Sequence, residues 1–467
     1  MKKLLLVSLT LQLALVGCTV DNPVDNPVKD LSTQEAFDEY KSSYISYQLA
    51  EANFFEPEAS FRQSSLYRMC QAMPKGADLH VHCDALLPIV ELIKFVSDHP
   101  NELVVCCVAG KDFGMLRYIG DGTPCPEGYK TMADALKSGC TQDDFVRAWT
   151  IKGTGTQRAW DWFEGIFDKN INLTSSVSLL EDYYTRAFNF YLDQGVVHME
   201  LRPLFFGDHA AALERGRAFY RAMNTARKKN PEFSVRLIGC GLKAKTDAYD
   251  KTQYNEMLID NAVYVSLNLK DTVAGLKDFL VGLDLVNEED LSVRLTDFKE
   301  LLANARKQNP NLHLTLHAGE SLKSDNVEIS SALSLGAERI GHGFNLYKYP
   351  DVLAQVKQKG IALEVCPISN HYLGYADDLT QHPAKDYIRQ GVSVVLCDDD
   401  PAYLEGNPYV DDVFAAVVAW NLSLDELEQL FRLSITKSFL TEDLKQQHLA
   451  SFEKRWAAFR AQKWPLP

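Results

Sequence analysis

Short apolar runs recur along the chain, and most are separated by stretches in which apolar residues follow helical spacing. Eight runs have the length and composition of buried strands: Asp78–His82, Gly195–Arg202, Ser234–Cys240, Phe279–Leu285, Leu312–His317, Arg339–His342, Ile361–Cys366 and Val392–Cys397. Strands that alternate with helices form a parallel sheet, and eight such units close into a barrel. The pattern therefore predicts an α/β protein with a (β/α)8 TIM barrel.

Two regions do not fit this alternation. Roughly a hundred residues separate the first two predicted strands, far more than an ordinary connection between neighbouring strands. We interpret residues from about 90 to 190 as an insertion that caps the barrel mouth. Residues 34–73 are rich in Tyr, Phe, Glu and Ala and predict a helical arm. The barrel with its insertion is then expected to span residues 74–460.

The N-terminus has the pattern of an export signal. A basic start at Lys2 and Lys3 is followed by an apolar run too short to span a bilayer. Leu15-Val16-Gly17-Cys18 resembles the bacterial lipobox, in which the cysteine carries lipid. Residues 1–18 are thus predicted to be a lipoprotein signal peptide, and residues 19–33 a flexible tether. An ordinary signal peptide with a chance cysteine is the alternative to anchoring in the cell envelope.

Charge and cysteine content narrow the class of protein further. The formal net charge of −15 argues against a non-specific nucleic-acid binder, which needs a basic face. Nine cysteines remain if Cys18 carries lipid, and four of them cluster in the insertion: Cys106, Cys107, Cys125 and Cys140. An oxidising compartment would allow a disulfide there, but the spacing leaves the pairing open.

Candidate metal ligands stand at the ends of several predicted strands. His80 and His82 alternate with apolar residues, so both imidazoles face the same side of their strand. His317 ends the fifth predicted strand, His342 ends the sixth, and Asp398-Asp399-Asp400 follows the eighth. Three imidazoles and a carboxylate suit Zn²⁺ with an open position for water. Because barrel enzymes place their chemistry at the carboxyl ends of strands, histidines and one aspartate from these strand ends are predicted to bind one metal ion.

Four motifs in this order resemble a known family: His80-x-His82-x-Asp84, His317-Ala318-Gly319-Glu320, Gly341-His342-Gly343 and Asp399-Asp400-Pro401. The set is similar to the adenosine deaminases of the amidohydrolase superfamily, over roughly residues 40–450. Further matches are Met199-Glu200-Leu201-Arg202, Asp284-Leu285-Val286, and Glu364-Val365-Cys366-Pro367 with Ser369-Asn370. The segment Met73-Pro74-Lys75-Gly76-Ala77 and the insertion resemble the secreted branch, the adenosine-deaminase-related growth factors.

The resemblance implies a role for each matched residue. His80, His82, His317 and Asp399 would bind zinc, which lowers the pKa of bound water from 15.7 to about 7. Glu320 would donate a proton to purine N1, where negative charge develops, and therefore needs a raised pKa. His342 would orient or deprotonate the water that the metal binds. Asp400 would contact N7, and Asp84 a ribose hydroxyl.

Two further positions are candidate substrate contacts. Asn287 stands where the family usually has a glycine whose backbone N–H meets purine N3, so the added side chain could narrow the pocket. Trp162 belongs to an aromatic run, Trp160 to Phe167, that has helical spacing and serves either as core or as a substrate wall.

The sequence therefore predicts zinc-dependent deamination of adenosine and 2′-deoxyadenosine to the inosine nucleoside and ammonia, outside the cytoplasm, for purine salvage. A deaminase of another 6-aminopurine, such as adenine or an N6-substituted nucleoside, keeps the same metal chemistry. A surface lipoprotein that binds nucleosides without turnover is the alternative from another class, although a binder needs neither Glu320 nor His342. The resemblance to the secreted branch also implies a possible homodimer through the arm.

Overall fold

The computed structural model describes residues 30–46, 60–110, 112–151, 159–174, 176–243, 251–272, 278–404 and 406–465. Its largest sheet has eight parallel strands in the order β12-β11-β10-β9-β8-β7-β6-β2. These are β2 (Ala77–His82), β6 (His198–Arg202), β7 (Ser234–Leu242), β8 (Leu280–Val286), β9 (His313–Ala318), β10 (Arg339–His342), β11 (Ala362–Val365) and β12 (Val394–Leu396). The predicted α/β barrel is confirmed.

The first and last strands of this sheet meet at a seam. Val81 of β2 pairs in parallel with Asp399, which follows β12. The backbone N–H of His82 donates to the Asp399 carbonyl at 2.9 Å, and the Asp399 N–H donates to the His80 carbonyl at 3.0 Å. These bonds bring residues near the two ends of the barrel sequence into direct contact.

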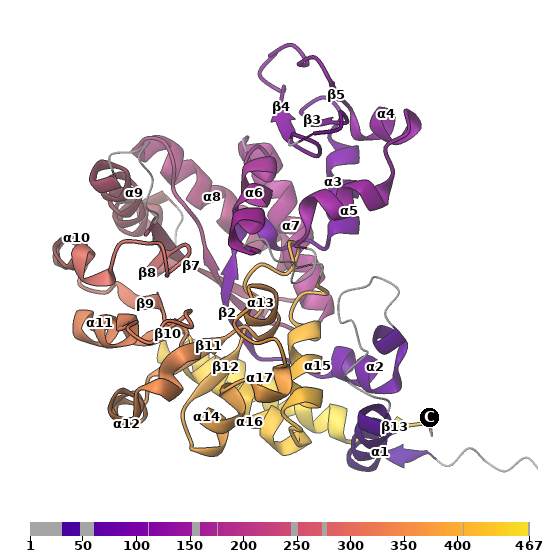
Figure 1. The fold of residues 1–467 in the computed structure, drawn as a ribbon, viewed down its shortest axis with the longest axis vertical. Coiled ribbons are helices and arrows are strands. Elements are labelled where there is room, and N and C mark those ends of the chain that lie inside the picture. The colour runs from indigo at the N-terminus through magenta and orange to yellow at the C-terminus, as the bar shows by residue number, and fades with distance from the viewer. Residues whose placement is uncertain are drawn as a thin grey trace, which may run out of the picture.

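Helices from the repeating units surround the barrel (Figure 1). They are α8 (His209–Ala226), α9 (Lys251–Thr272), α10 (Lys299–Gln308), α11 (Glu328–Leu335), α12 (Pro350–Lys359), α13 (Pro367–Tyr372), α14 (Ala384–Arg389), α15 (Val410–Ala419), α16 (Leu424–Thr436) and α17 (Glu442–Arg460), with short 3-10 turns η4 (Leu295–Phe298), η5 (Phe344–Lys348) and η6 (Leu379–Gln381). Local sequence sets their ends. Ser423 and Glu426 form a capping box at the start of α16. Gly360 ends α12 in a left-handed conformation.

The insertion follows the first barrel strand and forms a lobe of its own. It contains η3 (Cys83–Ala85), α3 (Ile89–Asp98), β3 (Leu103–Cys106), β4 (Leu116–Tyr118), β5 (Tyr129–Lys130), α4 (Met132–Lys137), α5 (Gln142–Trp149), α6 (Ala159–Asn170) and α7 (Val177–Asp193). Strands β4, β3 and β5 make an antiparallel sheet that projects from the barrel (Figure 1). A disulfide joins Cys107 to Cys140. The bridge lies within the cysteine cluster whose pairing the sequence left open.

The arm precedes the barrel and packs beside the C-terminus (Figure 1). It consists of β1 (Leu31–Ser32), α1 (Thr33–Ser46), η2 (Ser60–Gln63) and α2 (Ser65–Ala72), and β1 pairs antiparallel with β13 (Lys463–Trp464). Tyr67 of α2 donates to Asp411 of α15 at 2.6 Å, which ties the arm to the barrel.

The predicted tether ends earlier than expected. Leu31 is buried and pairs with Trp464, so residues 31–33 belong to the folded arm rather than to a tether over residues 19–33. The predicted signal peptide and Cys18 lie outside the described residues.

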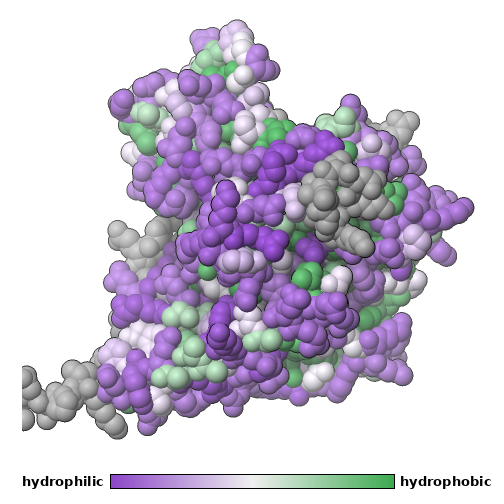
Figure 2. All heavy atoms as spheres, turned by 180° about the vertical axis from the view of Figure 1, so that it is seen from behind, coloured by the Kyte–Doolittle hydropathy of each residue, from purple (hydrophilic) through white to green (hydrophobic). Residues whose placement is uncertain are grey.

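The face drawn in Figure 2 is mainly hydrophilic, with hydrophobic residues in small groups between polar ones. Among the described helices, none is both long enough and apolar enough to cross a bilayer.

Candidate active site

Four potential metal ligands converge at the barrel seam. His80 and His82 come from β2, His317 from β9, and Asp399 follows β12. Their ligand atoms all lie within 4.8 Å of one another. His82 Nε2 is 3.1 Å from Asp399 Oδ1, and His80 Nε2 is 3.3 Å from the same oxygen. The structure thus brings together the four residues that the sequence predicts as ligands.

Hydrogen bonds behind two of these rings show that the group fits a cation. His80 Nδ1 lies 3.0 Å from Glu364, and His317 Nδ1 lies 2.8 Å from Asp284. Nearby arginines and histidines hold the pKa of both carboxyls low, so both are ionised and can only accept. Each ring therefore carries a proton on Nδ1 and turns its Nε2 toward the other ligands. The two Nε2 atoms are 3.0 Å apart, close enough for both to coordinate one cation.

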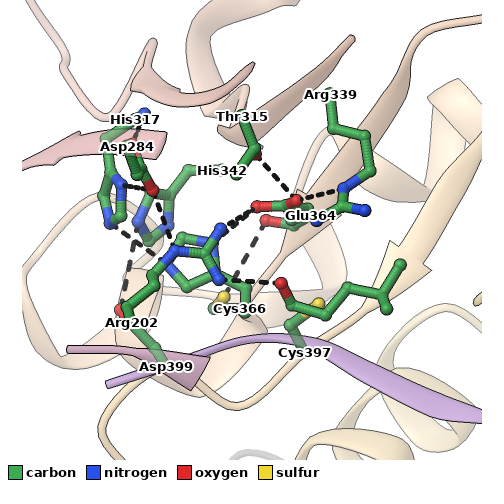
Figure 3. A network of polar contacts seen from close by, with 12 residues as sticks. Arg202, Asp284, Thr315, His317, Arg339, His342, Glu364, Cys366, Cys397 and Asp399 are labelled. Carbon is green, nitrogen blue, oxygen red and sulfur yellow. Dashed lines mark hydrogen bonds and ion pairs between the residues drawn. The ribbon is translucent and has the colours of Figure 1, made fainter. Parts of the chain in front are cut away.

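A buried ionic network holds the two supporting carboxylates (Figure 3). Arg202 donates to Asp284 at 2.8 Å and to Glu364 at 2.5 Å. Arg339 and Thr315 donate to the other oxygen of Glu364 at 2.6 and 2.8 Å. Such partners fix the tautomer and orientation of metal-binding histidines. The resemblance covers Arg202, Asp284 and Glu364 but assigns them no role, and their signal is a charged side chain within an otherwise apolar strand.

Two site residues adopt backbone conformations that L residues rarely occupy. Asp399 has φ of 60° and His342 has φ of 61°. A non-glycine residue in this region costs of order 1–3 kcal/mol and persists only where its surroundings hold it. Ser369 helps hold Asp399, since its hydroxyl donates to Oδ2 at 2.7 Å.

Glu320 lies buried beside the metal ligands. It is 2% exposed, and among the described residues none forms a hydrogen bond with its Oε1 atom. Burial, reinforced by the charge of Asp399, raises the pKa of Glu320 well above its usual value. A carboxyl group that stays protonated near neutral pH can donate a proton, as the predicted role requires.

His342 shares the same pocket. Its Nε2 is 3.7 Å from Glu320 Oε2 and 4.0 Å from Asp399 Oδ2. Burial lowers the pKa of His342 well below its usual value, so the ring is neutral.

Two predicted substrate contacts, Asp400 and Asp84, follow the ligands Asp399 and His82 along the chain. Asp400 is 2% exposed, and its Oδ1 has no hydrogen-bond partner among the described residues. Asp84 borders a cavity of about 60 Å³ that is also lined by Arg215. Asn287 has φ of 100°, which explains why glycine suits this position, and its side chain donates to Glu164 of α6 at 3.3 Å.

Helix α6 contacts three loops at the carboxyl ends of the barrel strands. Trp160, Glu164 and Phe167 share one helical face. Trp160 donates to Tyr375 at 2.9 Å, Glu164 accepts from Asn287, and Phe167 packs on Tyr403 with ring centroids 4.9 Å apart. The insertion therefore lies over the barrel mouth.

Trp162 occupies a different side of α6. It is 45% exposed, and its indole N–H donates to the Thr150 carbonyl at 3.0 Å within the insertion. Positions two apart on a helix face nearly opposite directions, so Trp162 points away when Trp160 faces the mouth. This arrangement does not support Trp162 as a substrate contact, and Trp160 is the tryptophan at the mouth.

Comparisons with known proteins agree with this geometry. A profile of the adenosine deaminase family matches residues 194–454. The chain is 29% identical over 409 residues to adenosine deaminase 2 of Dictyostelium discoideum. The alignment covers 83% of this chain and 73% of that protein. Adenine deaminase from Arthrobacter aurescens has a similar structure, with a TM-score of 0.55 and 24% identity over 82% of this chain and 99% of that one.

A second solved structure shares the fold. An amidohydrolase from Burkholderia ambifaria with bound Zn has a TM-score of 0.59 and 16% identity, over 85% of this chain and 95% of that one. The family match spans more than half of this chain and contains His317, Glu320, His342 and Asp399. The chain belongs to the adenosine deaminase family.

Proposed function

We propose that the protein catalyses zinc-dependent hydrolytic deamination of adenosine and 2′-deoxyadenosine, releasing ammonia and the corresponding inosine nucleoside. The observation that carries this proposal is Glu320, a buried carboxyl with a raised pKa beside three histidines and an aspartate. A site that only bound a nucleoside would gain nothing from a proton donor at this position.

Each residue of the site has a separate role in this reaction. When bound, zinc supplies Lewis acidity that makes water a nucleophile near neutral pH. Glu320 donates its proton to purine N1 while the water oxygen bonds to the carbon that bears the amine. His342 orients that water. The Asp400 side chain meets N7, so the ring is held from two sides before the carbon–nitrogen bond to ammonia breaks.

The nucleoside is preferred over the free base because Asp84 is available for a ribose. Asp84 stands two residues after the metal ligand His82, and its backbone carbonyl, not its carboxyl group, accepts from the hydroxyls of Tyr183 and Tyr403. A carboxylate there would repel a 5′-phosphate, which disfavours nucleotides. Adenine remains the competing substrate, since a similar structure belongs to an adenine deaminase.

Absorbance spectroscopy tests this function directly. The purified protein lacking residues 1–18 is expected to convert adenosine to inosine, and a strong chelator should abolish the conversion because the ligand group then loses its cation. Restoring zinc should recover it. Turnover of adenine but not of adenosine would identify adenine as the substrate. If neither compound is converted, the protein is not the proposed enzyme.

We further propose that the protein is exported and lipid-anchored through Cys18. The disulfide between Cys107 and Cys140 supports an oxidising compartment. In a bacterial host fed a labelled fatty acid, the full-length chain should incorporate label and Cys18→Ala should not. Cys125→Ala is the matched control, because Cys125 is exposed and has a free thiol. This variant should incorporate the label normally. Equal labelling of Cys18→Ala would disprove the anchor.

A further inference from the structure

Three buried side chains form a chain of hydrogen bonds that ends on His342. The backbone N–H of Ala384 donates to His382 Nδ1 at 3.1 Å. His382 Nε2 is 3.1 Å from Asn370 Oδ1, and Asn370 Nδ2 is 3.3 Å from His342 Nδ1. Asn370 lies on α13, and His382 precedes α14, so both belong to the segment that follows β11.

The direction of these bonds is settled at one end. A backbone N–H can only donate, so His382 Nδ1 must be the acceptor and its proton must lie on Nε2. His382 Nε2 then donates to the Asn370 oxygen. That bond fixes the Asn370 amide, whose nitrogen faces His342 and donates to Nδ1.

The opposite direction is excluded by the same backbone group. A flipped Asn370 amide would present its nitrogen to His382 Nε2, which would then have to accept. The His382 proton would move to Nδ1 and face the Ala384 N–H, which would place two donors 3.1 Å apart. A doubly protonated His382 would create the same conflict.

The surroundings of His382 keep its ring neutral. The rings of Phe344 and Trp420 lie 5.1 and 5.3 Å from it, centroid to centroid. The side chain is 2% exposed, and burial lowers the pKa of His382 to about 3. The ring therefore has one proton and one acceptor, as the chain of bonds requires.

We propose that His382 and Asn370 are positioning residues that fix His342 with its proton on Nε2. His342 then acts as a hydrogen-bond donor to the nucleophilic water and not as its base. The assignment of the proton stands on the hydrogen bonds alone, whereas the role toward water rests on the proposed function.

This assignment changes where the proton of water goes. Nε2 of His342 carries a hydrogen and has no free lone pair, so it cannot accept that proton. The acceptors beside it are the carboxyl oxygens of Glu320 and Asp399, at 3.7 and 4.0 Å. Once Glu320 has given its proton to purine N1 it is a carboxylate, and it can take the proton that water releases.

Nitrogen NMR of the zinc-loaded protein tests the proton position without turnover. The chain has 11 histidines, so labelling histidine with ¹⁵N gives a small set of imidazole signals. The His342 signals are identified by their loss in His342→Gln. We expect a protonated Nε2 and a bare Nδ1 for His342, and a proton on Nδ1 would overturn the proposal.

Variants at Asn370 and His382 test the positioning role. Asn370→Asp keeps the shape but offers a carboxylate, so His342 should move its proton to Nδ1 and kcat should fall by about 100-fold with KM little changed. His382→Gln retains an N–H donor toward Asn370 and should keep the tautomer, whereas His382→Phe removes that donor and should lose the tautomer together with part of kcat. Asp377→Asn, which replaces an exposed carboxylate after α13, is the control and should leave kcat unchanged. Wild-type kcat and tautomer in Asn370→Asp would contradict the proposal.

The outcomes separate this proposal from the proposed function. If Asn370→Asp does not fold, the wild-type spectrum and His382→Gln still decide the tautomer. A wild-type protein with the Nε2 proton that deaminates neither adenosine nor adenine would reject the function and leave the tautomer assignment intact.

Discussion

Replacing Glu320 with glutamine is expected to lower kcat for adenosine by about 10²- to 10⁴-fold, the usual contribution of a general acid. Glutamine has the same size and can still hydrogen-bond purine N1, but it has no proton to release as charge develops there. Zinc content and KM should stay close to wild type because Glu320 is outside the ligand group. Steady-state kinetics and elemental analysis of the same preparation measure all three quantities.

The matched control is Glu338→Gln. Glu338 forms an ion pair with His313, the first residue of β9. His317 lies near the other end of the same strand. Its replacement should leave kcat unchanged. Normal turnover by Glu320→Gln would show that another group protonates the ring.

Replacing Asp399 with asparagine is expected to remove both zinc and activity. Asparagine keeps the size of the side chain and tolerates the positive φ at this position better than alanine does, so the variant isolates the loss of negative charge. The three histidines are neutral donors, and without the carboxylate the site loses its only anionic ligand among the four. Zinc content should fall well below one ion per chain, with kcat falling by at least about 10³-fold.

Asp377→Asn serves as the control, because Asp377 is an exposed carboxylate in the loop after α13. It should retain both zinc and activity. An Asp399→Asn protein that keeps a full complement of zinc and turns over normally would remove Asp399 from the ligand set.

The barrel could be predicted because its strands are buried on both faces. Such strands are nearly continuous apolar runs, and each of the eight predicted runs overlaps an observed strand. Their ends differ by a few residues, as at Gly195, which precedes β6 by three positions. The end of the tether was predicted wrongly, since a two-residue strand such as β1 depends on its partner β13 and has no periodicity of its own.

The ligand group could also be predicted, because its residues stand at strand ends that a barrel must bring together. Other parts of the site depend on contacts that spacing does not encode. The choice between Trp160 and Trp162 is set by the rotation of α6 over the mouth. The bond from His382 to Asn370 joins two loop positions 12 residues apart, and no motif spacing reports it. The positive φ of His342 and Asp399 is likewise imposed by the fold.

The seam between Val81 and Asp399 has a consequence for biosynthesis. Half of the ligand set is translated more than two hundred residues before the other half, and only the docking of the final strand onto the first unites them. A chain truncated before Asp399 therefore lacks one of the four ligands and cannot assemble the complete ligand group. The ligand group is complete only when the barrel is closed.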